Sequence, residues 1–123
     1  MRVMVVEDDP SIRETLGMVL EAYGHQADLI DKGEIVLDYL KENWPDVILL
    51  DILMPGIDGL KTCEMLNADP LGNVTPIIIL SALDKNQDKL KAYKLGVVDY
   101  LTKPIEKNTL ITKIEKALRS KQK

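Results

Sequence analysis

The stretch Val47-Ile48-Leu49-Leu50-Asp51 decides how this chain folds, because four apolar residues in a row end in a carboxylate. Three further apolar runs end in polar residues in the same way: residues 3–6 before Glu7, residues 77–80 before Ser81, and residues 97–101 before Thr102 and Lys103. Short apolar runs bounded by turn signals are typical of parallel strands that are buried on both faces. Ligands of an open parallel sheet bind outside the carboxyl ends of its strands, so we expect these polar side chains to meet at one edge.

Helical patterns lie between these runs, so strands and helices alternate. Apolar residues at helical spacing extend from Pro10 to Gly24, and a weaker strand over residues 26–30 suits a sheet edge. Further helices are expected at residues 35–40, after an N-cap at Asp58, at residues 86–95 and at residues 110–118, with a loop at residues 54–56. This alternation predicts a single domain with a five-stranded parallel sheet and helices on both faces, an α/β fold.

Length and composition narrow the class of protein. The chain has 123 residues, enough for one domain, and a net charge of −4, which argues against direct nucleic-acid binding. The single cysteine, Cys63, excludes an internal disulfide and is interpreted as a packing residue, and His25 as a surface residue. With no signal peptide and no apolar stretch of the roughly 20 residues that span a membrane, we expect a cytoplasmic protein without a membrane segment.

The residues at the predicted edge suit phosphoryl transfer to a carboxylate. Glu7, Asp8 and Asp51 would form an all-oxygen ligand set for a hard divalent ion, Mg²⁺ or Mn²⁺. Asp51 is the best candidate nucleophile, while Lys103 and Ser81 could stabilise the phosphoryl oxygens. Each residue alone has an ordinary structural role as a cap, turn former or backbone partner. Their occurrence together, at the ends of successive strands, favours the functional interpretation.

With these residues in place, the chain resembles a receiver domain of bacterial two-component response regulators from Val3 to about Leu118. The resemblance implies a doubly wound, flavodoxin-like sheet of order 2-1-3-4-5. The resemblance depends on four segments: residues 5–9 (VVEDD), 49–59 (LLDILMPGIDG), 81–82 (SA) and 99–104 (DYLTKP). It implies a role for each matching residue: Asp51 as phosphoacceptor, Asp8 as direct and Glu7 as water-mediated metal ligand, the Leu53 carbonyl as a further ligand, Ser81 and Tyr100 as switch residues, and Lys103 as phosphate partner before a cis peptide to Pro104. Asp9 is expected to start the helix with Pro10.

The resemblance also implies a switch rather than an enzyme. A histidine kinase or phosphotransfer protein would supply the phosphoryl group, which adds a charge of about −1.5 to −2. Ser81 would then move toward it and Tyr100 would turn inward from an exposed position, which remodels the face of the fourth helix, fifth strand and fifth helix. Val98 and Ile105 depart from the pattern of receivers that pair through this face. A homodimer and an apolar patch for a different partner, an effector domain or protein among them, therefore stay open.

Two aliphatic residues bear on the lifetime of the phosphorylated state. Leu53 and Leu83 lie two residues after Asp51 and Ser81, where side chains of the family flank the phosphoryl group. Aliphatic groups there hinder an attacking water without orienting one, so we expect a slowly hydrolysed acyl phosphate.

Three other functions are weighed against the switch. A phosphohydrolase would need a second acid where Leu53 stands, and a flavodoxin-like electron carrier would need a glycine- and hydroxyl-rich loop where residues 7–9 are acidic. An unphosphorylated interaction module is the third. The receiver domain is expected to span residues 1–119, with a polar tail or truncated linker at 120–123, so the chain is either a stand-alone receiver or the front of a longer protein.

Overall fold

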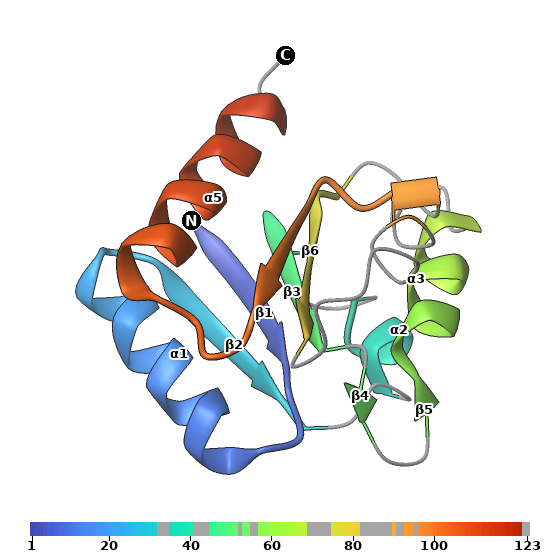
Figure 1. Ribbon diagram of the computed structural model, residues 1–123, viewed down its shortest axis with the longest axis horizontal. Helices are drawn as coiled ribbons and strands as arrows, with labels where there is room; N and C mark the ends of the chain where they lie inside the picture. The colour runs from blue at the N-terminus through green and yellow to red at the C-terminus, as the bar shows by residue number, and fades with distance from the viewer. Residues whose placement is uncertain are drawn as a thin grey trace.

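The computed structural model describes residues 1–31, 35–40, 45–51, 53–54, 57–68, 75–81, 90, 93–94 and 96–121. The strands are β1 (Arg2–Val6), β2 (Gln26–Ile30), β3 (Val47–Asp51), β4 (Leu53–Met54), β5 (Ile57–Asp58), β6 (Ile77–Ser81) and β7 (Asp99–Thr102). The helices are α1 (Pro10–Ala22), α2 (Val36–Leu40), α3 (Gly59–Ala68) and α5 (Lys107–Lys121). Five strands pair in parallel in the order β2-β1-β3-β6-β7, which is the predicted order 2-1-3-4-5 (Figure 1).

Helices cover both faces of this sheet, as predicted. Figure 1 shows α1 and α5 on one side and α2 and α3 on the other. Alternate residues of β1 face opposite layers: Val3 and Val5 belong to the core under α1 and α5, and Met4 and Val6 to the core under α2 and α3. Burying one such side chain contributes about 1.5–3 kcal/mol relative to its exposure. Packing on both faces therefore fixes where each strand ends.

Local signals set the ends of α1. One carboxylate oxygen of Asp9, Oδ1, accepts from the backbone N–H groups of Ser11 at 2.9 Å and Ile12 at 3.2 Å, and Pro10 occupies the first turn. Gly24 follows the helix with φ +85°, a conformation that favours glycine. The predicted roles of Asp9, Pro10 and Gly24 are confirmed.

Several elements differ in detail from the sequence-based expectation. The loop expected after β3 contains the two short strands β4 and β5, which pair antiparallel with each other. The helix expected at residues 86–95 lies largely outside the described residues, although Tyr93 and Lys94 are helical, and α5 continues to Lys121. Cys63 is fully buried, as predicted. His25 is half-buried rather than exposed, because its backbone N–H donates to Leu20 O and turns the chain back against the end of α1.

Candidate functional site

The carboxyl ends of four neighbouring strands bring the predicted polar residues to one edge of the sheet. Glu7 directly follows β1, Asp51 ends β3, Ser81 ends β6, and Lys103 directly follows β7. A backbone hydrogen bond joins the ends of β6 and β7, because the Lys103 N–H donates to Ser81 O at 2.8 Å. The Lys103–Pro104 peptide is cis, as predicted. Residues that are up to 96 positions apart in sequence thus share one site because parallel strands end together.

Three carboxylates gather there. One oxygen from each of Glu7, Asp8 and Asp51 lies within 4.8 Å of the others. The side chains of Glu7 and Asp51 are almost fully buried, at 0% and 1% exposure, whereas Asp8 is more exposed. The cluster therefore has two buried acids and one that faces the opening of the site.

Lys103 provides the positive charge among these acids. Its Nζ lies 2.8 Å from Glu7 Oε2 and 3.0 Å from Asp51 Oδ2, and only 16% of its side chain is exposed. Burial by itself lowers the pKa of Lys103, but hydrogen bonds and attraction to Glu7 and Asp51 outweigh it and raise the pKa above its ordinary value. The ammonium therefore stays charged and bridges the two buried carboxylates.

The proton affinity of Glu7 is strongly perturbed. Burial raises the pKa of Glu7 from 4.5 to about 7, and repulsion from Asp51 adds to the increase, although Lys103 opposes it. Near neutral pH, the metal-free site is therefore poised between a charged and a protonated Glu7.

The donor set fits a hard divalent ion. All three ligand groups offer oxygen, as Mg²⁺ and Mn²⁺ prefer, and among the described residues no other such group of histidine, cysteine or acidic side chains occurs. Glu7 Oε2 is buried and lies 2.8 Å from the Lys103 ammonium, and a carboxylate oxygen has a second lone pair that can face a cation. The predicted ligand role of the Leu53 carbonyl stays a prediction, and Leu83 lies outside the described residues.

Tyr100 does not have the exposed starting position that we expected. Only 5% of it is exposed, and it packs in the core that also contains Val97 and Ile79. The strand alternation explains this position, because it turns the Tyr100 ring into the layer under α2 and α3. The structure therefore has the inward arrangement of the expected switch residue.

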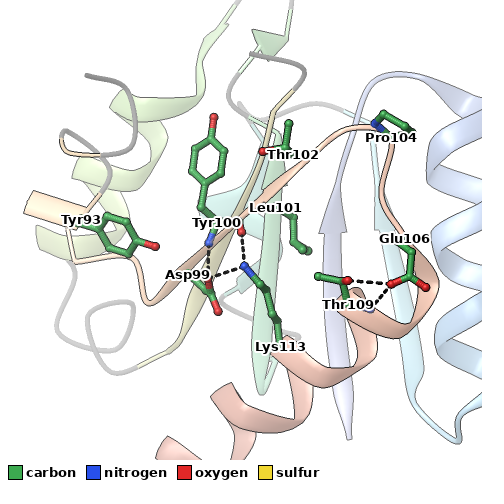
Figure 2. Close-up of a pocket in the computed structure, with 9 residues that line it drawn as sticks. All are labelled: Tyr93, Asp99, Tyr100, Leu101, Thr102, Pro104, Glu106, Thr109 and Lys113. Carbon is green, nitrogen blue, oxygen red and sulfur yellow. Dashed lines mark hydrogen bonds and ion pairs between the residues drawn. The ribbon is translucent and has the colours of Figure 1, made fainter. Parts of the chain in front are cut away.

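A clip between β7 and α5 was not predicted from the sequence. Lys113 Nζ donates to Asp99 Oδ1 at 2.9 Å and to the backbone O of Tyr100 at 2.7 Å, while the Tyr100 N–H donates to the same Asp99 oxygen at 2.8 Å (Figure 2). Asp99, Tyr100 and Lys113 are among the residues that line a hollow of about 370 Å³ beside β7. The sequence signal was weak, because Lys113 is one of several basic residues on the amphipathic final helix. Val98 is 45% exposed nearby, as the apolar-patch alternative requires.

A second unpredicted contact involves Arg13 on α1. Its Nη1 donates to the backbone O of Glu7 at 2.9 Å and to that of Asp8 at 3.3 Å. The signal in the sequence was its spacing, because Arg13 lies one helical turn after the N-cap Asp9. The guanidinium group thus touches the main chain of the acidic pair.

A doubly wound sheet whose strand ends hold three carboxylates and a bridging lysine defines a class of protein: phosphoacceptor-type α/β domains of flavodoxin-like order. Comparison with known families agrees, since the response regulator receiver domain pattern matches residues 3–115. The chain belongs to the response regulator receiver domain family.

Individual relatives span the chain almost completely. It is 34% identical over 118 residues to the phosphate regulon transcriptional regulatory protein PhoB of Klebsiella pneumoniae, and 34% identical over 117 residues to protein PilH of Pseudomonas aeruginosa. These alignments cover 96% and 95% of this chain. The chain spans about half of PhoB (52%) but 97% of PilH.

Solved structures give the same result. A putative response regulator from Chloroflexus aurantiacus superposes with a TM-score of 0.91 at 32% identity, covering 96% of this chain and 97% of that one. The receiver domain of the Francisella response regulator 1452 has a TM-score of 0.89 at 33% identity and 97% coverage of both chains. Within the described residues, no helix is long and apolar enough to cross a membrane.

Proposed function

We propose that this domain is a phosphorylation-controlled switch in which Asp51 accepts a phosphoryl group from a histidine kinase or phosphotransfer protein. An Asp51 carboxylate oxygen would attack phosphorus, a P–O bond would form as the P–N bond breaks, and the donor histidine, which carries a proton on its other ring nitrogen, would leave as neutral imidazole. The single observation that carries the proposal is the Lys103 ammonium, which lies between buried Glu7 and Asp51.

Each neighbouring residue has a matching role. Glu7, Asp8, Asp51 and the Leu53 carbonyl would hold Mg²⁺ or Mn²⁺, which when bound neutralises negative charge on the transferred group. Lys103 would pair with a phosphoryl oxygen, and the buried Ser81 hydroxyl would donate to another. The chain would catalyse only its own transfer and, with Leu53 and Leu83 beside the group, a slow hydrolysis.

Because Tyr100 is already buried, the proposed switch stabilises this inward position of the ring. Phosphorylation would favour the arrangement in which Ser81 approaches the phosphoryl group and the Tyr100 ring stays inward, at the expense of an outward ring. Because the Tyr100 main chain is joined to Lys113, a change there would reach the face formed by β7 and α5. This face would engage a second copy or an effector in the cytoplasm.

The test is intact mass after incubation with acetyl phosphate. We expect one phosphoryl adduct on the wild type with Mg²⁺, none without metal, and none on Asp51→Asn. Asp31→Asn is the matched control, because Asp31 is an exposed aspartate that follows β2 at the same edge of the sheet. If neither acetyl phosphate nor beryllofluoride modifies the wild type, the switch proposal fails and the interaction module replaces it. Multiple turnovers of a phosphate ester would instead support a phosphohydrolase.

A further inference from the structure

The loop that carries the acidic pair is held through its main chain. At its start, the Glu7 N–H donates to Ile30 O of β2 at 3.0 Å. At its end, the Asp9 N–H donates to Glu7 Oε1 at 3.2 Å, and Asp9 itself caps α1. Between these two points, the carbonyl groups of Glu7 and Asp8 turn toward α1.

Arg13 is the side chain that receives those two carbonyl groups. One atom, Nη1, lies 2.9 Å from Glu7 O and 3.3 Å from Asp8 O. The main chain of Arg13 is held in the first turn of α1, since its backbone N–H donates to Asp9 O at 2.9 Å. Its side chain is half-buried. A planar guanidinium group offers several N–H donors in a fixed geometry, which suits two neighbouring main-chain oxygens.

We propose that Arg13 is a positioning residue that holds the acidic loop in its metal-binding geometry through the main-chain oxygens of Glu7 and Asp8. The inference rests on the proposed function, because it assigns the loop to Mg²⁺. The side-chain hydrogen bonds of Arg13 go to main-chain oxygens, and they involve neither Asp51 nor the carboxylate oxygens of Glu7 and Asp8. It lowers the freedom of two consecutive ligand residues before the ion arrives, and that preorganisation favours binding.

Charge and position predict opposite effects of removing Arg13. A positive group near the carboxylates repels a divalent cation, so its loss would tighten Mg²⁺ binding if charge were its main contribution. Loss of a group that orients metal ligands typically weakens metal binding by about 10- to 100-fold. The sign of the change in affinity therefore distinguishes the two roles.

The experiment measures Mg²⁺ affinity by isothermal titration at constant ionic strength for the wild type, Arg13→Gln, Arg13→Lys and Arg119→Gln. Arg119 is an exposed arginine on α5 and is the matched control. We expect about tenfold weaker binding for Arg13→Gln, a smaller loss for Arg13→Lys, which keeps the charge, and no change for Arg119→Gln. Unchanged or tighter binding by Arg13→Gln overturns the inference.

Amide exchange in metal-free protein provides a second readout. The Asp9 N–H donates to Glu7 Oε1, so its exchange rate reports the order of the loop without any ion. Faster Asp9 exchange in Arg13→Gln, or in Arg13→Lys if the first variant does not fold, supports the inference, and an unchanged rate overturns it. If the wild type binds no Mg²⁺, the proposed function fails, while the exchange rates still decide whether Arg13 positions the loop.

Discussion

Replacing Glu7 by glutamine should stabilise the metal-free protein above neutral pH. The pKa of Glu7 is raised from 4.5 to about 7, so the folded protein holds this proton more tightly than the unfolded chain. Ionisation of Glu7 therefore destabilises the fold progressively as the pH rises from about 4.5 to 7, and the full cost is present above 7. Lys103 has a raised pKa and stays charged in this window, so it adds no slope.

The structure sets the size of the effect. A shift of this extent corresponds to about 3–4 kcal/mol at pH 8, since one pKa unit is about 1.4 kcal/mol. Glutamine also weakens the contact with Lys103, so we expect a net gain of about 1–2 kcal/mol. For a domain of this size, that gain raises the Tm by roughly 4–8 °C.

The assay is thermal and urea unfolding of the wild type and Glu7→Gln in EDTA at pH 5 and pH 8. Glu14→Gln is the matched control, because Glu14 is exposed on α1. The advantage of Glu7→Gln should be present at pH 8, shrink at pH 5, and disappear when Mg²⁺ stabilises the wild type. A metal-free Glu7→Gln that is less stable than the wild type at pH 8 would refute the reasoning.

Three further predictions follow from other contacts. Lys113→Met should lower the free energy of unfolding in urea by about 0.5–1 kcal/mol, because it removes a partly exposed ion pair with Asp99 and a hydrogen bond to the Tyr100 main chain. Amide exchange at Tyr100 should become faster, and an unchanged exchange rate would contradict the clip. Glu106 caps α5, and hydrogen bonds to Thr109 and Asn108 lower its pKa. Glu106→Gln should therefore reduce thermal stability above the ordinary carboxyl pKa, with the difference lost as the pH falls through the lowered pKa. Gly24→Ala and Gly96→Ala should each cost at least about 1 kcal/mol by urea unfolding, because both glycines have positive φ, at +85° and +93°. The Cβ added at Gly96 also meets the end of the Asn67 side chain at 2.7 Å, but that side chain can turn away. A cost near zero at either position would contradict this.

The site could be predicted from the sequence wherever a residue ends a buried strand. Asp51 and Ser81 are placed by the apolar runs before them, because a parallel sheet aligns its carboxyl ends. The exposed position that the resemblance implied for Tyr100 was wrong, since the sequence does not say whether an aromatic ring on an edge strand packs inward or turns to solvent. The 5% exposure of Tyr100 results from its packing in the core under α2 and α3.

By itself, the sequence determined the alternation of strands and helices, the capping of α1 and the acidic edge, because these depend on local patterns of apolar residues, proline, glycine and carboxylates. Only the tertiary structure decided that Arg13 holds the acidic loop and that Lys113 joins α5 to β7. Those contacts pair charged side chains with main-chain oxygens, and every residue has such an oxygen. No sequence pattern shows which main-chain oxygen will accept a hydrogen bond from Arg13 or Lys113. That choice depends on how the helices dock on the sheet.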